Sequence, residues 1–294
     1  MTTVHTYVDE EVSDLERRLS LFTGDLFVYS PRDSSLALGA AAHQVVEQTL
    51  GAEPARAQVR LSEAEFTVLY RAAVRGVQHT LPALAAGLVA DMGCDPATTF
   101  MGPPTLVVTT GAGYLAHGLG APQHPHRDTW YAASPSQVNW SVPLYDLDAG
   151  AAVAFHPHYF DVALVNSSDA FDYEEWQVAR RSGRSGGPAH PLTQPRPLQP
   201  IDLAPEIRIR CPVGAVMIWS AAHLCSTVPN ETLTSRFSVR FQTVCQVDLE
   251  GGVGAANLDA DPQGTSLEGF VRCSDGGPMP PALVRRDLEQ RLRP

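Results

Sequence analysis

The sequence predicts a mixed α and β protein, mainly β, whose double-stranded β-helix core (jelly-roll or cupin-like) stands behind an N-terminal layer of helices. Up to residue 102 the apolar residues recur with a helical period, whereas from Pro103 they gather in short runs between glycine and proline turns. The chain has 294 residues, of which 44% are hydrophobic, and this is enough for one large core. We therefore expect a single domain over 1–294, with a helical front at 1–102, the jelly-roll core at 103–247 and a C-terminal extension at 248–294.

Local signals place the elements of the helical front. Helices are expected at 9–21, 34–50, 62–80 and 81–92, with one more near the C-terminus at 281–293. Ser62 and Glu65 have the spacing of a capping box ahead of an apolar-periodic run. Gly51 is a typical residue just after a helix end.

The core is expected to consist of short strands joined by turns. They are predicted at 105–110, 138–147, 151–155, 207–210, 214–219 and 237–247. Strands of this length, interrupted by Gly and Pro, favour a sandwich or barrel over βαβ units. Residues 168–205 include a stretch rich in Pro, Gly and Arg that is too long for a hairpin, so we interpret this segment as a surface loop or lid.

Composition excludes several classes of function. A net charge of −11 and a pI near 5.3 provide no positive field for a phosphate backbone, so nucleic acid is not an expected partner. The sequence contains no lysine, which excludes lysine Schiff-base and P-loop chemistry and leaves arginine or protonated histidine for fixed positive charge. The five cysteines are widely spaced and lack a C-x-x-C pair, which argues against a disulfide framework or a zinc ribbon. No signal-peptide core or long apolar stretch is present, so we expect a cytoplasmic monomer or homodimer without membrane contact.

One set of residues indicates a metal site. His126 and Asp128 are two residues apart, so on a strand they face the same side and can bind one ion. With His223 as a third ligand they would form the facial triad of a non-haem Fe(II) centre. A lone H-x-D pair is often a surface loop, but this one follows the helices and opens the β-rich region. His124 is an alternative partner for His126, although Pro125 restricts the backbone between them.

Further along, Arg236 and Ser238 offer a guanidinium fork and a hydroxyl for the carboxylate of a 2-oxo acid. Arg240 shares their strand face and is interpreted as either a second carboxylate contact or a salt-bridged edge residue. Together with the metal motif, these residues point to an Fe(II)/2-oxoglutarate oxygenase.

At the level of motifs the chain resembles the phytanoyl-CoA dioxygenase-like branch of the Fe(II)/2-oxoglutarate oxygenases. The resemblance rests on HPHRDTW at 124–130, QVNWSVPLYDLD at 137–148, AFHPHYF at 154–160, SAAHLCSTVPN at 220–230 and SRFSVRFQTV at 235–244, with GDLFVYSP at 24–31 in the front. It implies that His126 and Asp128 bind iron and that Arg236, with Ser238 beside it, holds the distal carboxylate of 2-oxoglutarate. It also implies that Trp140 forms part of the wall of the active-site pocket.

One position departs from the family pattern. There the second metal histidine stands about five residues before an asparagine and about eleven before the clamping arginine; counted back from Asn230 and Arg236, this position is Cys225. His223 lies two residues earlier, and two strand residues span about 7 Å. Three interpretations follow. A bulge in the strand could move His223 to the metal, Cys225 could bind the metal instead, or the triad could be incomplete. Imidazole suits a ferrous centre better than an oxidisable thiolate, so His223 is our prediction.

The function implied by the resemblance is oxidative tailoring of a small molecule with O2 and 2-oxoglutarate, with hydroxylation as the default outcome. The carboxylate ligand Asp128 is present, which argues against a halogenating variant. Cys225 supports a rival hypothesis, a catalytically silent jelly-roll binding protein with an altered metal site. A cupin-like metal enzyme without 2-oxoglutarate is disfavoured by the Arg236 and Ser238 pair.

Overall fold

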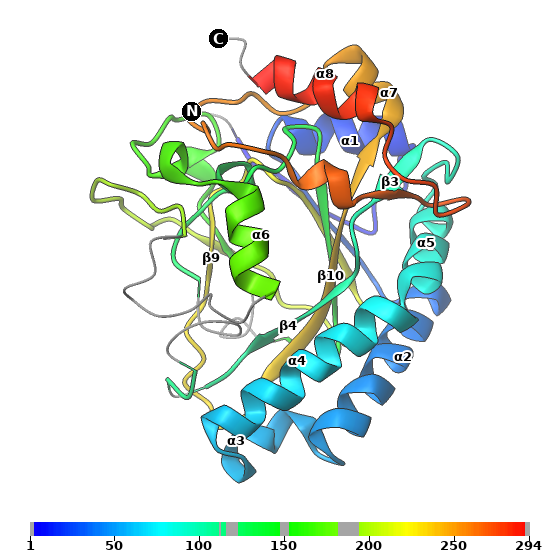
Figure 1. The fold of residues 1–294 in the computed structure, drawn as a ribbon, viewed down its shortest axis with the longest axis vertical. Helices are drawn as coiled ribbons and strands as arrows, with labels where there is room; N and C mark the ends of the chain where they lie inside the picture. Colours follow the sequence, from blue (N-terminus) through cyan, green and yellow to red (C-terminus); the bar gives the residue numbers. More distant parts are fainter. Residues whose placement is uncertain (1–2, 112, 116–122, 148–152, 182–193, 292–294) are drawn as a thin grey trace.

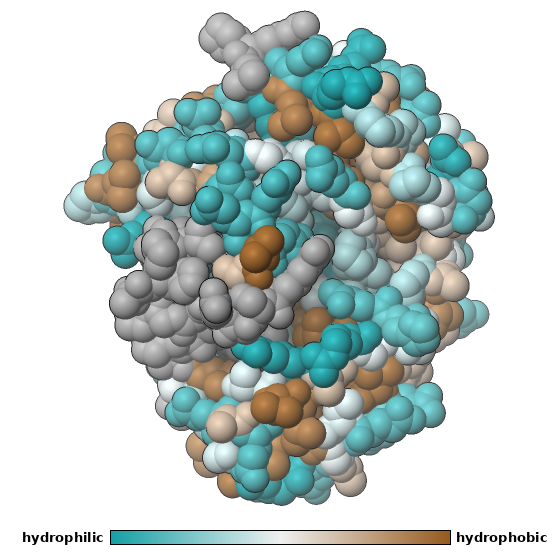
Figure 2. All heavy atoms as spheres, in the orientation of Figure 1, coloured by the Kyte–Doolittle hydropathy of each residue, from teal (hydrophilic) through white to brown (hydrophobic). Residues whose placement is uncertain are grey.

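The computed structural model describes residues 3–111, 113–115, 123–147, 153–181 and 194–291. It combines helices with two β-sheets, so the predicted mixture of α and β structure is confirmed. Figure 1 shows α2, α4 and α5 along one side of the large sheet, with α6 on the side where β9 lies. On the face drawn in Figure 2, hydrophilic and hydrophobic side chains are mixed, as is usual for protein surfaces.

The larger sheet has eight strands in the order β1-β2-β8-β5-β10-β3-β11, with β4 also paired to β10. Their bounds are β1 Thr6–Val8, β2 Leu26–Tyr29, β3 Thr99–Met101, β4 Thr105–Thr109, β5 Val138–Pro143, β8 Val216–Ser220, β10 Arg236–Cys245 and β11 Val271–Arg272. The smaller sheet has the order β7-β6-β9, formed by β6 Val153–Phe155, β7 Ile207–Arg208 and β9 Cys225–Thr227.

The helices are α1 Asp14–Phe22, α2 Asp33–Leu50, α3 Ala57–Arg60, α4 Glu63–Thr80, α5 Pro82–Asp91, α6 Tyr173–Arg181, α7 Gln246–Gly251 and α8 Pro281–Arg291. The Ser62 and Glu65 capping box at the start of α4 is formed as predicted, with each side chain accepting from the other residue's backbone N–H. Gly51 follows α2 with φ +90°, in the region that favours glycine. No helix among the described residues is long and apolar enough to span a bilayer.

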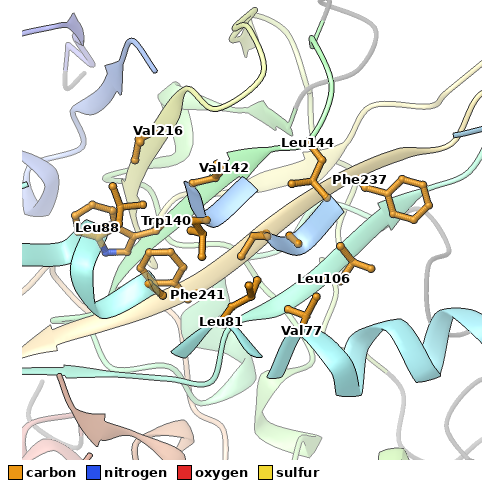
Figure 3. Packing of buried hydrophobic residues seen from close by; sticks show 14 of the residues in the cluster. Val77, Leu81, Leu88, Leu106, Trp140, Val142, Leu144, Val216, Phe237 and Phe241 are labelled. Atoms are coloured by element: carbon orange, nitrogen blue, oxygen red, sulfur yellow. The ribbon is translucent and has the colours of Figure 1, made fainter. Parts of the chain in front are cut away.

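The long strand β10 separates two environments. Its residues Phe237, Val239 and Phe241 are buried in the main core against the helices of the front. Figure 3 shows Phe237 and Phe241 in this cluster with side chains from α4 and α5. Full burial of such a side chain contributes about 1.5–3 kcal/mol, so this face anchors the sheet. Side chains at the intervening positions, Arg236 to Gln242, are only partly buried and face the other way.

The smaller sheet packs over that second face of the larger one. Phe155 of β6 and Cys225 of β9 share a hydrophobic cluster with Met217 and Trp219 of β8. The rings of Phe155 and Trp219 meet edge to face, with centroids 5.6 Å apart. Both sheets therefore contribute side chains to one shared hydrophobic cluster.

The structure differs from the expected elements in several places. Residues 24–31, assigned to the helical front, contain β2, which pairs with β8 and in parallel with β1. The strand expected at 237–247 ends at Cys245, where α7 begins. The predicted lid at 168–205 contains α6, while its residues 182–193 lie outside the described part of the chain, as do 151–152 of the strand expected at 151–155.

Candidate functional site

The H-x-D segment lies beside β9 of the smaller sheet. The backbone N–H of His126 donates to the carbonyl of Cys225, and the N–H of Cys225 donates back to His126, each at 2.9 Å. Asp128 donates its N–H to the carbonyl of Ala221 at 3.0 Å. Nε2 of His126 and Oδ1 of Asp128 are 3.6 Å apart. The structure thus brings these two predicted ligands together.

Hydrogen bonds orient both donor groups. Nδ1 of His126 lies 2.9 Å from the carbonyl oxygen of His124, so the proton belongs on Nδ1 and the lone pair on Nε2. The amide of Gln137 donates to Oδ1 of Asn139, and Nδ2 of Asn139 donates to Oδ2 of Asp128. These two hydrogen bonds hold Oδ2 of Asp128, so that its Oδ1 is directed at the lone pair on Nε2 of His126.

A divalent ion fits between these two atoms after a small movement. Two donors about 2.1 Å from one ion are about 3.0 Å apart at a right angle, which is slightly closer than the pair observed here. His126 is buried, whereas 31% of the Asp128 side chain is exposed, so the pair opens to one side. Within the described ranges, no group of three or more His, Cys, Asp or Glu side chains is placed to hold an ion.

Cys225 is the next potential donor to this pair. It stands directly opposite His126 in the antiparallel bridge, so both side chains point to the same face. Burial, with a smaller contribution from Asp128, raises the pKa of its thiol well above the usual range, and Arg240 and Arg127 oppose that rise. The thiol is therefore protonated in the protein as it stands. All five cysteines are free.

The structure does not bring His223 into this group. A turn at residues 221–224 directs its ring against Phe155 and Phe160, at centroid distances of 5.5 and 4.7 Å. Neither ring nitrogen meets a hydrogen-bond partner among the described residues. Burial lowers the pKa of His223 to about 3, against the opposing effect of the nearby Gly24 and Asp25 backbone. The imidazole is therefore neutral.

The register of β10 places the predicted co-substrate residues. Arg236 and Ser238 alternate with the core residues of β10, so they share the interior face with Arg240. On the neighbouring strand, Ser141 lies opposite Arg240. The two residues predicted to bind a carboxylate are therefore on one face of one strand.

Trp140 is placed on the other face of the sheet. Its ring stacks on Phe241 at 5.7 Å, and its Nε1 donates to Oγ1 of Thr243. Figure 3 shows it within the hydrophobic cluster. Strand alternation explains the difference from the expected pocket wall: Asn139, one position earlier, faces Asp128, so Trp140 must face the helices.

Sequence reasoning missed a buried network that fixes the H-x-D segment. Arg127, between the two predicted ligands, forms an ion pair with Asp259, and both side chains are almost completely buried. Its remaining guanidinium N–H groups donate to the carbonyls of Tyr159, Val162 and Ala222. Asp259 lies far away in the sequence, and nothing local could have indicated it. The only signal of this network in the sequence is the arginine at position 127, between the two predicted ligands.

Tyr131 connects the site to the predicted lid. Its ring contacts His126 edge to face at 5.3 Å, and on its other side it contacts Phe171 and Trp176 of the 168–181 segment. Part of the predicted lid thus lies against His126 through this tyrosine.

Comparison with known proteins gave matches among solved structures. No family model and no curated protein sequence matches this chain. The epimerase SnoN from nogalamycin biosynthesis, described as non-heme and alpha-ketoglutarate dependent, is 13% identical over 90% of this chain and 95% of its own, with a TM-score of 0.44. EvdO2 from Micromonospora carbonacea var. aurantiaca is 13% identical over 87% of this chain and 97% of its own, with a TM-score of 0.46. The non-heme monooxygenase ThoJ is 13% identical over 89% of this chain and 90% of its own, with a TM-score of 0.41.

Proposed function

We propose that this protein is a non-haem Fe(II)/2-oxoglutarate-dependent oxygenase that oxidatively tailors a small molecule, within a double-stranded β-helix formed by its two sheets. The observation that carries the proposal is the orientation of the His126 and Asp128 donors toward a common point. Histidine nitrogen and carboxylate oxygen are the ligands of the Fe(II) facial triad. The hydrogen bonds behind them are of the kind that fixes metal ligands in proteins.

In this proposal His126 and Asp128 hold the iron, which together with 2-oxoglutarate and O2 supplies the oxidising chemistry for a C–H bond. Arg236 binds the distal carboxylate of 2-oxoglutarate through its guanidinium fork, with the Ser238 hydroxyl beside it. The apolar side chains of Phe155 and Trp219 keep water from the inner end of the site.

The third protein ligand in this proposal is either Cys225 or His223. Cys225 lies on the same face as His126, because the two residues are directly opposite cross-strand neighbours. His223 needs the turn at 221–224 to rearrange, although its imidazole is the better ligand for iron. The geometry favours Cys225 and ligand chemistry favours His223, so substitution of each residue separates them. Loss of metal in His223→Ala but not in Cys225→Ala assigns the histidine, and the reverse result assigns the thiolate.

A second candidate function is a jelly-roll binding protein without catalysis. It is motivated by the absence, among the described residues, of a third donor placed with His126 and Asp128. Such a protein would bind a small acid through the arginines of β10 without retaining iron.

Anaerobic titration with Fe(II) and 2-oxoglutarate tests the main proposal without knowledge of the substrate. We expect a weak visible charge-transfer band in the parent protein and its loss in Asp128→Ala. His124→Ala is the matched control, because this neighbouring imidazole is held at Nε2 by the carbonyl of Pro195. If the parent binds 2-oxoglutarate but never retains Fe(II), the binding-protein alternative holds.

A further inference from the structure

Asp259, in the C-terminal extension, accepts hydrogen bonds from two different parts of the chain. Its Oδ1 accepts from Nε1 of Trp130 at 2.7 Å, and its Oδ2 accepts from Nε of Arg127 at 3.2 Å. Oδ2 also accepts from the backbone N–H of Leu164 at 2.9 Å. Trp130 and Arg127 belong to residues 124–136, which carry the predicted metal ligands and which we name the ligand segment. Leu164 begins residues 164–173, which enter the predicted lid and which we name the lid base. One buried carboxylate therefore holds both segments.

The residues that follow Asp259 run along the lid base. Every second residue of 259–263 is hydrogen-bonded to it. The atom pairs are Asp259 O with Asn166 Nδ2 at 2.7 Å, Asp261 N with Ser168 Oγ at 3.0 Å, Gln263 N with Phe171 O at 2.9 Å and Gln263 O with Tyr173 N at 3.1 Å. The bridge between Asp172 and Gln263 is parallel, so the two segments have the same direction. The lid base is therefore bound to the C-terminal extension near both of its ends.

The lid base meets the ligand segment at a second place. The ring of Phe171 contacts the ring of Tyr131 edge to face at 5.3 Å, and the ring of Tyr131 contacts that of His126 at the same distance. His126 is one of the two predicted metal ligands. A movement of the lid base relative to the ligand segment would therefore disturb both the Asp259 hydrogen bonds and the packing against a ligand.

The carboxylate of Asp259 cannot be replaced without loss of one of these connections. Both of its oxygens are used, and together they accept from three N–H groups. An amide has one acceptor oxygen, and its NH2 group would face another donor. Asparagine can therefore serve only one side of the carboxylate, and alanine serves neither. A buried N–H that loses its acceptor is costly, so the segments are expected to open locally.

We propose that Asp259 is a positioning residue that ties the lid base to the ligand segment, so that binding of an ion at His126 and Asp128 and ordering of the lid base are coupled. An ion that orders one segment reduces the conformational freedom that remains to be lost in the other, and the coupling is reciprocal. The identity of the ion rests on the proposed function. The connection between the two segments rests only on the hydrogen bonds of Asp259 and its neighbours.

Amide hydrogen exchange, followed by mass spectrometry of peptides, tests the connection in the metal-free protein. We expect Asp259→Ala to accelerate exchange in both the ligand segment and the lid base, by about tenfold or more beyond any change in β10, whose amides report on global unfolding. Asp259→Asn should give a smaller increase in the same segments, and it carries the test if Asp259→Ala does not fold. Asp248→Asn is the matched control, because it alters another buried carboxylate, which pairs with Arg18 of α1.

The same measurement with Mn(II) tests the coupling. Calorimetry first gives the Kd of each protein, so that every sample is saturated with the ion. In the parent, Mn(II) should slow exchange in the lid base as well as in the ligand segment, although the lid base contains no predicted metal ligand. In Asp259→Ala, Mn(II) should slow exchange in the ligand segment alone. This readout does not depend on turnover or on knowledge of the substrate.

The outcomes separate this inference from the proposed function. Asp259 has only a general structural role, and the proposal is overturned, if fewer than both segments respond to its replacement, if β10 responds equally, or if Asp248→Asn accelerates the same two segments. The proposal also falls if Mn(II) protects the ligand segment of the parent but not its lid base, or protects the lid base equally in Asp259→Ala. If the parent binds no ion while both segments respond selectively to Asp259, the connection stands and the oxygenase assignment fails.

Discussion

At the scale of single residues, the site depends on how neighbours orient each donor. Asn139 is the clearest case, because it lies on β5 and its amide both accepts from Gln137 and donates to Asp128. The amide fixes which oxygen of Asp128 faces His126. Without it the carboxylate would be free to rotate, and part of the binding energy of an ion would go into ordering it.

We therefore predict that Asn139→Ala lowers metal affinity by about ten- to a hundredfold while leaving the fold intact. Calorimetric titration with Mn(II) measures the effect. Gln246→Ala is a suitable control, since that amide donates to Glu250 on the exposed surface of α7. Unchanged Mn(II) affinity in Asn139→Ala would show that Asp128 needs no support.

His156 gives a prediction for pH. It is fully buried, with Nδ1 facing the carbonyl of Leu203 and Nε2 facing the hydroxyl of Ser226, each at 3.0 Å. Burial lowers the pKa of His156, against the effect of the Leu203 carbonyl. The unfolded chain then takes up the proton first, so stability is full above the ordinary histidine pKa of about 6.5 and falls as the pH drops below it.

Urea unfolding at pH 7 and pH 5 measures this loss of stability at low pH. His156→Gln should lose less free energy of unfolding between the two pH values than the parent does, because it removes one proton-binding site from the unfolded state. Equal losses in the two proteins would mean that His156 does not contribute to acid sensitivity.

At the scale of elements, the parts that the sequence predicted are those with local causes. The helix α4 begins at its capping box and α2 is followed by Gly51, because capping signals lie within a few residues of the helix ends. The strand β2 was missed although LFVY between Gly24 and Ser30 is an apolar run of strand length. Its place beside β8 depends on a partner almost two hundred residues away, which no local pattern specifies.

The same reasoning applies to the candidate site. His126 and Asp128 were proposed from their spacing, and they lie close together although Asp128 begins a short 3-10 helix and does not continue a strand. Arg236 and Ser238 were proposed from strand alternation, and both lie on one face of β10. The position of His223 could not be predicted, since it depends on the turn at 221–224. The contact of Arg240 with Trp219 joins β10 to β8, which are about twenty residues apart in the sequence, so it appears only in three dimensions.

The Arg127 and Asp259 pair joins four segments and gives a prediction for stability. Asp259 also accepts from Nε1 of Trp130 at 2.7 Å and from the backbone N–H of Leu164 at 2.9 Å. We expect Asp259→Ala to lower the free energy of unfolding by about 3–5 kcal/mol, because it leaves the buried guanidinium of Arg127 without its counter-charge. Urea denaturation measures the change.

The surface pair of Arg208 and Glu206 is the control for this measurement. Glu206→Ala should cost about 0–1 kcal/mol, as is usual for exposed ion pairs. A similarly small loss in Asp259→Ala would show that the carbonyls around Arg127 are sufficient to hold it and that the ion pair is not needed.

At the scale of the whole molecule, the site exists only when both sheets are assembled. The larger sheet supplies Asn139 and Arg240, and the segment that bridges to the smaller sheet supplies His126 and Asp128. An unfolded chain cannot present these groups together, so an ion bound by them must stabilise the folded state as a whole.

This linkage gives a prediction that distinguishes the oxygenase from the silent binding protein. Mn(II) at a free concentration of one hundred times its Kd should raise the free energy of unfolding of the parent by about 2.7 kcal/mol. The measurement is a urea titration of the protein with the ion, compared with a reference titration in excess chelator without the ion. In Asp128→Ala the increase should disappear, because the remaining imidazole alone holds a divalent ion weakly. A parent protein whose stability does not respond to Mn(II), Fe(II) or Zn(II) would have no metal site in its folded state, since any ion that binds the folded chain in preference to the unfolded one must shift the equilibrium between them.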